Sequence, residues 1–266
     1  MNSRVAIVTG GGSGLGRVMA QEFVANGTPC VITGRRLRSL EETASSIPEK
    51  NCNLLSIVQG DVTVEADRSR IVEECIAKFG RVDILVNNAG ISFQAPLLSH
   101  EEKEWREVMS TNLDSLFFMA KVVIPHMRDQ KWGRIINIAS VYSSLALNND
   151  FYCGLLPTTN ERGLGPTRQP AYHASKGGVL NLTRDLAVAV ASWGITVNAV
   201  SPGMFLTEQS DAIVNDEVKR ALQVMTPLGR FGEPREVAHA VRFLASEQTD
   251  FITGIDLVVD GGWSLW

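Results

Sequence analysis

The sequence contains few of the features that mark a membrane, secreted or nucleic-acid-binding protein. No apolar run approaches the ~20 residues that span a bilayer, and the longest runs are segments such as LAVAVA. The N-terminal MNSRVAIVTGGG lacks the apolar core and cleavage site of a signal peptide. The net charge is only -4 and long blocks of like charge are absent, which argues against nucleic acid or an anionic membrane as a partner. These absences predict a cytoplasmic protein with a small-molecule partner.

Metal-binding and nucleophilic patterns are equally sparse. The four cysteines form no C-x-x-C pair, and the four histidines show neither metal-ligand spacing nor an evident aspartate partner. The first absence argues against zinc and thioredoxin-like sites, and the second gives no support to a serine hydrolase triad. We therefore expect no bound metal. Hydrophobic residues nevertheless make up 44% of the 266 residues, which is enough for a sizeable core.

Short apolar segments rich in β-branched residues alternate with longer segments of helical period. The strand-like segments are VAIVT, CVIT, LLSIV, ILVN, RIINIAS, ITVNAVS and DLVVD. Helices are expected at residues 14–26, 66–79, 112–130, 172–193 and 234–244. This alternation is typical of a parallel sheet that helices cover on both faces. We predict one α/β domain over residues 1–266 with a doubly wound parallel sheet, the Rossmann fold; only residues 141–170 and 204–226 depart from the pattern.

A glycine cluster lies between the first predicted strand and the first predicted helix. Gly10, Gly14 and Gly16 occur in VAIVTGGGSGLGRVMAQEF, where glycine lets backbone N–H groups and the positive end of a helix approach a pyrophosphate. The spacing is G-x-x-x-G-x-G rather than the common G-x-G-x-x-G, so a tight strand-to-helix turn is the alternative. The position of the cluster in an alternating chain favours dinucleotide binding.

The end of the next predicted strand bears on which dinucleotide binds. NAD-binding folds usually place an acidic residue there for the ribose hydroxyls, whereas arginine suits the extra phosphate of NADP. This chain has Gly34 at that position, followed by Arg35 and Arg36, and arginine can bind phosphate through two hydrogen bonds. A solvated helix start would also explain these arginines, and Ser13 adds no positive charge to the glycine loop. We predict NADP as the cofactor, with NAD as the alternative.

Seven motifs occur in one order along the chain. They are TGGGSGLG from Thr9 to Gly16, Asp61-Val62, NNAG at residues 87–90, STNL around Asn112, INIAS ending at Ser140, YHASK from Tyr172 to Lys176, and SPG at residues 201–203. This series resembles the short-chain dehydrogenase/reductase family over essentially the whole chain, down to the terminal ITGIDLVVDGG. The resemblance implies an NAD(P)-dependent oxidoreductase that moves hydride between a nicotinamide cofactor and a secondary alcohol or ketone. Family members commonly form tetramers, so the resemblance also implies a homotetramer.

The resemblance assigns cofactor-binding roles residue by residue. The glycine loop would hold the pyrophosphate, Asp61 and Val62 the adenine, and Thr207 the nicotinamide carboxamide. The implied set is Gly10, Ser13, Gly14, Leu15, Gly16, Arg35, Asp61, Val62, Asn88, Ala89, Gly90, Tyr172, Lys176, Pro202, Gly203 and Thr207. Phe205 is bulkier than the Ile or Val expected beside the nicotinamide, so it either narrows the pocket or points elsewhere.

Asn112, Ser140, Tyr172 and Lys176 match the catalytic tetrad of the family. Tyr172 and Lys176 are four residues apart and would share one face of a helix. A cation about 5 Å from a phenol supplies on the order of 3 kcal/mol, most of the roughly 4 kcal/mol that lowers a phenol pKa from about 10 to about 7. We therefore expect a lowered pKa for Tyr172. The resemblance implies that Tyr172 exchanges a proton with the substrate oxygen that Ser140 binds, while Asn112 supports a water beside Lys176.

The segment between Ser140 and Tyr172 is longer than the family usually has. These residues are 32 positions apart, and the excess forms an inserted loop around residues 145–170 that is rich in glycine and proline. Long loops inside compact domains tend to be functional. One hypothesis makes residues 151–169 a lid or wall over the substrate, with Arg162 or Arg168 pairing with an anionic or polyhydroxylated ligand. The alternative is a surface elaboration or subunit contact.

Three functions remain open from the sequence. A sugar, polyol or sugar-acid substrate is the first hypothesis, because the inserted loop and the DGGW ending resemble sugar-oxidising relatives. A 3-oxoacyl thioester reductase is the second. A non-catalytic regulator that senses dinucleotides on the same fold is the third, although the presence of Ser140, Tyr172 and Lys176 counts against it.

Overall fold

A seven-stranded parallel sheet forms the centre of the protein. The computed structural model describes residues 4–152, 156, 163–206 and 215–265. Its main sheet has the strand order β3-β2-β1-β4-β6-β8-β9, and all neighbours are parallel. The strands are β1 (Ala6–Thr9), β2 (Cys30–Gly34), β3 (Leu55–Gln59), β4 (Ile84–Asn87), β6 (Gly133–Ile138), β8 (Ile195–Pro202) and β9 (Asp256–Val259). The order reverses between β1 and β4, so the predicted doubly wound α/β fold is confirmed.

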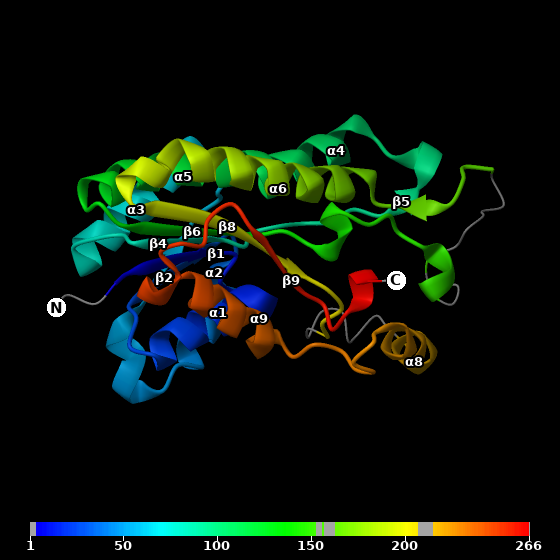
Figure 1. The fold of residues 1–266 in the computed structure, drawn as a ribbon, viewed down its shortest axis with the longest axis horizontal. Helices are drawn as coiled ribbons and strands as arrows, with labels where there is room; N and C mark the ends of the chain where they lie inside the picture. Colours follow the sequence, from blue (N-terminus) through cyan, green and yellow to red (C-terminus); the bar gives the residue numbers. More distant parts are fainter. Residues whose placement is uncertain (1–3, 153–155, 157–162, 207–214, 266) are drawn as a thin grey trace.

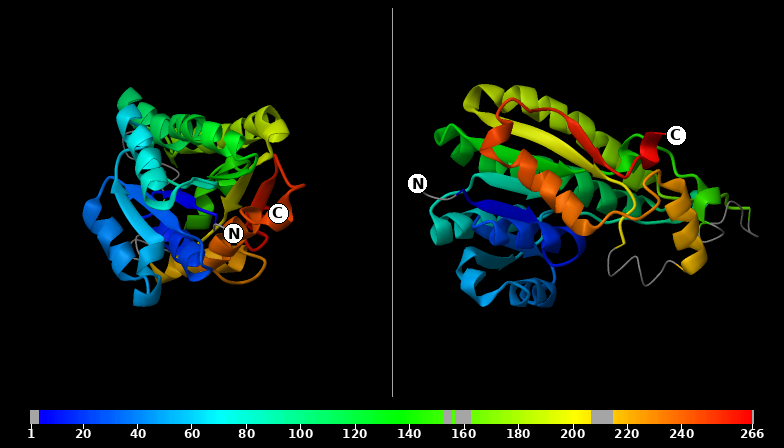
Figure 2. Two further views of the ribbon diagram at one scale, coloured as in Figure 1. Left: turned by 90° about the vertical axis from the view of Figure 1, so that its left-hand side faces the viewer. Right: turned by 60° about the horizontal axis from the view of Figure 1, so that its bottom comes forward.

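Two helical layers cover this sheet (Figures 1 and 2). One layer consists of α3 (Glu65–Phe79), α5 (Ser115–Asp129) and α6 (Pro170–Val190), and the other of α1 (Gly14–Ala25), α2 (Leu37–Ser45) and α9 (Pro234–Leu244). Strands β1, β4, β6 and β8 are buried at every position. Because both faces are covered, apolar side chains lie on both faces of these strands instead of alternating with exposed polar ones. None of the helices in the described part of the chain has the length and apolar character that a bilayer span requires.

Three short helices were not predicted. They are α2, α4 (Glu102–Met109) and α8 (Asp216–Met225). Each buries few side chains: α4 buries Val108, and α8 buries Val218 and Leu222. Such narrow stripes give little periodic signal. The predicted helix 112–130 also begins differently, because a π-helical turn (Ser110–Asp114) that contains Asn112 precedes α5.

The inserted loop is attached to the body of the protein by a small second sheet. Strand β5 (Ala95–Pro96) pairs antiparallel with β7 (Thr167–Arg168). The backbone N–H groups of Leu97 and Leu98 extend this pairing to the carbonyls of Pro166 and Leu164, both at 2.9 Å. Helix α8, β5 and the C-terminal turn all lie at the carboxyl end of the sheet, at the right of Figure 1. The described part of the insertion therefore lies at the end of the sheet where ligands bind in such folds.

A charged cluster closes the opposite, amino end of the sheet. Asp83 is fully buried and accepts hydrogen bonds from the backbone N–H of Val5 at 2.9 Å and from Arg81 Nε at 2.7 Å. Arg4 Nη1 lies 3.3 Å from the same carboxylate. These bonds join the start of β1 to the segment that leads into β4. A buried carboxylate is retained in a fold only when such partners compensate for its desolvation.

We expect the Asp83→Ala substitution to lower the free energy of unfolding by about 3 kcal/mol, because it leaves Arg81 and a buried N–H group without their acceptor. Denaturant titration measures the change. Arg38→Ala is the matched control, since Arg38 pairs with Glu42 on an exposed helix face and such pairs contribute at most about 1 kcal/mol. Equal effects of the two substitutions would contradict the structural role of Asp83.

Candidate active site

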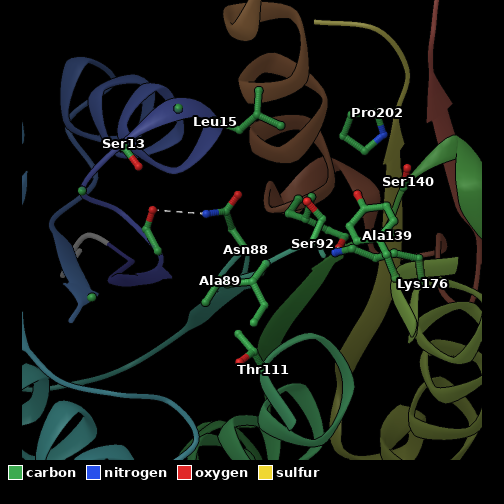
Figure 3. A pocket seen from close by; sticks show the side chains of 18 of the residues that line it. Ser13, Leu15, Asn88, Ala89, Ser92, Thr111, Ala139, Ser140, Lys176 and Pro202 are labelled. Carbon is green, nitrogen blue, oxygen red and sulfur yellow. Dashed lines mark hydrogen bonds between the residues drawn. The ribbon is translucent and has the colours of Figure 1, made fainter. Parts of the chain in front are cut away.

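A pocket of about 870 Å³ lies at the carboxyl ends of the sheet strands. Its walls come from the loops that follow β1, β2, β3, β4, β6 and β8, together with the start of α6. Figure 3 shows Ser13 on one side of the pocket, Ser140, Lys176 and Pro202 on the other, and Leu15 and Asn88 between them. The described members of the predicted site that line it are Gly10, Ser13, Gly14, Leu15, Arg35, Asp61, Val62, Asn88, Ala89, Gly90, Ser140, Tyr172, Lys176, Pro202 and Gly203.

The glycine loop is shaped by close backbone contacts. Gly10 and Gly14 have positive φ angles of 67° and 52°, which residues with a Cβ rarely adopt. A Cβ at Gly16 would lie 2.2 Å from the carbonyl oxygen of Gly10, so Gly16 is needed for the packing of α1 rather than for lining the pocket. Asn88 Nδ2 donates to the carbonyls of Thr9 at 2.9 Å and Gly10 at 3.3 Å. Asn88 therefore fixes the loop from the neighbouring strand.

The end of the pocket beyond the glycine loop carries positive charge. The residues that line it include Gly34, Arg35, Arg36 and Ser39, together with Asp61. One oxygen of Asp61 accepts hydrogen bonds from the N–H and hydroxyl of Thr63, at 2.9 and 2.8 Å, and this orients the carboxylate. The end of β2 has no acidic side chain, as the sequence predicted. An anionic group placed here meets two guanidinium side chains.

The other end of the pocket brings together Ser140, Tyr172 and Lys176. Ser140 follows β6, and its hydroxyl accepts a hydrogen bond from the backbone N–H of Tyr142 at 3.2 Å. Tyr172 lies in the first turn of α6 and lines the pocket together with Ser140. Lys176, one turn further along α6, is buried; its Nζ donates to the carbonyl of Ile138 at 2.7 Å and lies 5.7 Å from the centroid of the Tyr172 ring. The predicted shared helix face is thus present.

Burial controls the protonation of both groups. Burial raises the pKa of Tyr172, and the Ser140 hydroxyl offsets this only in part. Burial also lowers the pKa of Lys176 to about 8. The prediction that Lys176 lowers the pKa of Tyr172 is therefore wrong for this geometry, because desolvation of the phenolate outweighs stabilising contacts. The phenol is protonated at neutral pH, which is the form that can donate a proton to a carbonyl oxygen.

Comparisons with known proteins agree with this geometry. Residues 4–151 match the family described as short chain dehydrogenase, and residues 158–264 match the family described as enoyl-(acyl carrier protein) reductase. The chain is 36% identical over 262 residues to the 3-oxoacyl-(acyl-carrier-protein) reductase FabG of Vibrio cholerae, with 98% of each chain covered. It is 34% identical over 259 residues to FabG of Escherichia coli, with 97% and 96% covered. The chain belongs to the short-chain dehydrogenase family.

A solved structure of this family has the same fold. The crystal structure of a candidate gluconate dehydrogenase from Agrobacterium tumefaciens superimposes with a TM-score of 0.85 at 32% identity, covering 98% of this chain and 96% of the other. As a short-chain dehydrogenase, the protein is an NAD(P)-dependent oxidoreductase.

Of the predicted site residues, Asn112 and Gly16 do not line the pocket, and Thr207 lies outside the described residues. Asn112 is fully buried behind Gly90 and forms a pair of hydrogen bonds with the backbone of Ile91, both at 2.8 Å. Its Nδ2 also donates to Ser175 Oγ at 3.2 Å, so it joins the loop after β4 to α6. Gly16 lies behind the loop as described above.

Phe205 lines the pocket, and its ring packs against Gly232. A Cβ at Gly232 would lie 2.1 Å from the ring, and the two residues form an isolated β-bridge. The bulk of Phe205 is therefore accommodated by Gly232 on the neighbouring loop.

The hypothesis that Arg168 pairs with a ligand is not supported. Its guanidinium Nη1 donates to the carbonyl of Leu147 at 3.0 Å and to the side chain of Asn149, and Arg168 does not line the pocket. It stabilises the insertion instead. Arg162, the other residue of that hypothesis, lies outside the described residues.

Among the pocket residues outside the predicted catalytic and cofactor-binding sets are three polar ones, Tyr142, Tyr152 and Gln169. The last two lie within residues 151–169, the segment expected as a lid or wall. Their positions depend on how the insertion folds, which spacing does not reveal. One signal was present in the composition. The chain has three tyrosines, and all of them lie between Ser140 and Lys176.

Proposed function

We propose that the protein transfers hydride between NADP(H) and a secondary alcohol or ketone, with Ser140 and Tyr172 at the substrate oxygen. The observation that carries this proposal is that Ser140, Tyr172 and the buried Lys176 line the same pocket as the glycine loop. A sensor of dinucleotides has no need for a proton donor at that place.

The pocket residues fit a nicotinamide dinucleotide. Ser13 caps α1 without a side-chain hydrogen bond, and the first turn of α1 has no acidic side chain, so its backbone N–H groups remain available to phosphate oxygens. The glycine loop would hold the pyrophosphate, residues 61–62 the adenine, and residues 88–90 with Lys176 a ribose. A bound nicotinamide supplies or accepts the hydride.

The chain's own residues account for the movement of the proton. In carbonyl reduction the Tyr172 hydroxyl donates its proton to the substrate oxygen, while the Ser140 hydroxyl donates a hydrogen bond to the same atom. The nearby Lys176 ammonium stabilises the phenolate that remains. Asn112 acts as a positioning residue, because its bonds to Ile91 and Ser175 hold the start of α6 against the loop after β4.

Two substrate classes compete. The names of the curated relatives favour a 3-oxoacyl thioester, and we place it first. A sugar or polyol is the second candidate, because the insertion brings the polar side chains of Tyr152 and Gln169 to the pocket and a structural relative is described as a candidate gluconate dehydrogenase.

Initial rates with both cofactors test this proposal. Purified protein is incubated with NADPH or NADH and a 3-oxoacyl thioester, a polyhydroxylated ketone or a simple monoketone, and the reverse reaction is assayed with the corresponding alcohols and NADP or NAD. Absorbance reports the cofactor. Turnover of a thioester in preference to a polyol supports the first substrate class; tight cofactor binding without turnover of any compound would favour the sensor.

Arg35 is proposed to select NADP. We expect Arg35→Ala to lower kcat/KM for NADPH by roughly 10- to 100-fold, because a charged hydrogen bond contributes about 1.5–3 kcal/mol. The value for NADH should change less than about 3-fold, since NADH lacks the extra phosphate. Arg38→Ala is the control, as Arg38 lies outside the pocket wall and pairs with Glu42. A parallel loss with both cofactors would contradict this role.

The proposal extends to assembly and domain structure. Strands from both halves of the chain share one sheet, which supports a single domain over residues 1–266 with an insertion around residues 145–170. Phe117 and Phe118 of α5 remain 43% and 39% exposed, and such exposed aromatic surface favours self-association. A homotetramer is the assembly we propose, and sedimentation analysis measures it.

A further inference from the structure

We propose that Tyr142 and Tyr152 form a hydroxyl pair that binds a second, uncharged oxygen of the substrate, close to the carbon that exchanges hydride. This inference rests on the proposed function and specifies it. In a 3-oxoacyl thioester the second oxygen is the thioester carbonyl, and in a sugar or polyol it is a hydroxyl on a neighbouring carbon. The shared chemistry is a neutral oxygen that forms a hydrogen bond.

All three tyrosines of the chain meet in one pocket. Tyr142, Tyr152 and Tyr172 each line it, although they come from three different segments. The hydroxyl groups of Tyr142 and Tyr152 are hydrogen-bonded to each other. The ring of His173 has centroid distances of 4.7 Å to the Tyr142 ring and 6.2 Å to the Tyr172 ring. The pair therefore lies beside the proposed proton donor.

Tyr142 is held between the serine turn and the catalytic helix. Its backbone N–H donates to Ser140 Oγ at 3.2 Å, and its ring packs against the ring of His173 at a centroid distance of 4.7 Å. His173 Nδ1 lies 2.9 Å from the carbonyl oxygen of Gln169, which fixes that imidazole at the start of α6. The orientation of Tyr142 is thus set by the same elements that carry Ser140 and Tyr172.

Tyr152 is delivered by the insertion. It ends the 3-10 turn Asn149–Tyr152, whose Asn149 Nδ2 donates to the carbonyls of Leu156 at 2.9 Å and Thr167 at 3.0 Å. The preceding Phe151 meets Trp263 edge to face at 5.7 Å, and both belong to a hydrophobic cluster with Val218 and Leu222 of α8. These contacts hold the described part of the insertion so that the Tyr152 hydroxyl lies in the pocket.

The chemistry of the pair favours a neutral ligand. Burial raises the pKa of both tyrosines, so both hydroxyls stay protonated. One of the two O–H groups is used inside the pair, and the other remains for a ligand. Among the described residues that line this end of the pocket, the one cationic side chain is Lys176, and it is bonded to Ile138. A carboxylate bound here would have little charge compensation.

Tyr→Phe variants test the pair, because they remove each hydroxyl and keep the ring. For Tyr142→Phe, Tyr152→Phe and the double variant, kcat/KM is measured with three ketones: a 3-oxoacyl thioester, a vicinal hydroxyketone and a monoketone without a second oxygen. We expect a loss of about 10-fold in each single variant for a substrate whose second oxygen the pair binds. The loss should appear mainly in KM. The monoketone should change less than roughly 3-fold, and the double variant should lose less than the product of the single losses, since the two hydroxyls act as a unit.

The 3-oxoacyl thioester and the vicinal hydroxyketone each carry a second oxygen. The compound whose kcat/KM falls in the variants identifies the substrate class. Equal losses for all three ketones would overturn the proposal and indicate general positioning of Ser140 or Tyr172. Unchanged kcat/KM for every substrate would also overturn it. The affinity for NADPH serves as the folding control and should be unchanged.

A wild-type enzyme that reduces none of the ketones would contradict the proposed function rather than the pair. In that case calorimetric titration of the wild type and the double variant, each with bound NADP, uses the 3-hydroxyacyl thioester and a vicinal diol as probes. Weaker binding of one probe to the double variant supports the pair. Equal affinity in both proteins overturns it.

Discussion

Replacing Tyr172 with phenylalanine is expected to lower kcat for carbonyl reduction by at least about 1,000-fold, because the substitution removes the group that donates a proton to the substrate oxygen. The ring and the backbone of α6 remain, so the affinity for NADPH should change less than roughly 3-fold. Burial raises the pKa of Tyr172 and keeps the proton on the phenol at neutral pH. Stopped-flow absorbance of the cofactor measures the rate of the chemical step directly.

Tyr142→Phe is the matched control for this prediction. It is the same substitution in the same pocket, on a residue that contacts Ser140 but is not assigned the proton. With the monoketone its kcat should remain close to that of the wild type. A Tyr172→Phe enzyme that retains a tenth of the wild-type kcat would contradict the assignment of Tyr172.

Replacing Lys176 with methionine is expected to lower kcat/KM by roughly 100-fold or more, because the cation that stabilises the Tyr172 phenolate is lost while the side-chain volume is nearly kept. Since burial lowers the pKa of Lys176 to about 8, kcat/KM of the wild type should fall as pH rises through about 8. The variant should lack this limb of the pH profile. A profile that is the same in both proteins would assign the limb to another group.

The same lysine predicts a change in stability with pH. The ordinary pKa of 10.5 falls to about 8 in the folded protein, so between these values the unfolded chain holds a proton that the folded chain has released. The free energy of unfolding should therefore rise with pH across this interval in the wild type. Lys176→Met should remove that rise, and denaturant titration at several pH values measures it.

Much of the fold was accessible from the sequence because the strands are buried on both faces. Segments such as AIVT and ILVN are apolar at every position except the last, and they form β1 and β4 at the centre of the sheet. The glycine loop and the shared helix face of Tyr172 and Lys176 could also be predicted, because each motif lies within one strand-to-helix connection or about one helical turn. The spacing of residues that are close in the sequence is enough to predict contacts of this kind.

Features that depend on packing between distant segments were not accessible. The phenol of Tyr172 was expected to be acidic because spacing gives its distance from Lys176 but not its burial. Arg168 was expected at the ligand because its charge is visible, whereas its acceptors at Leu147 and Asn149 arise from the fold of the insertion. The Tyr142–Tyr152 pair was missed for the same reason.

The measurement that tests the central claim most directly is NADPH oxidation with a 3-oxoacyl thioester, a vicinal hydroxyketone and a monoketone, compared between the wild type and Tyr172→Phe at equal cofactor saturation. The account predicts ketone-dependent oxidation of NADPH by the wild type and its near-complete loss in the variant, with cofactor affinity retained in both. Ketone-dependent oxidation at similar rates in both proteins, or in neither while NADPH binds tightly, would contradict the account.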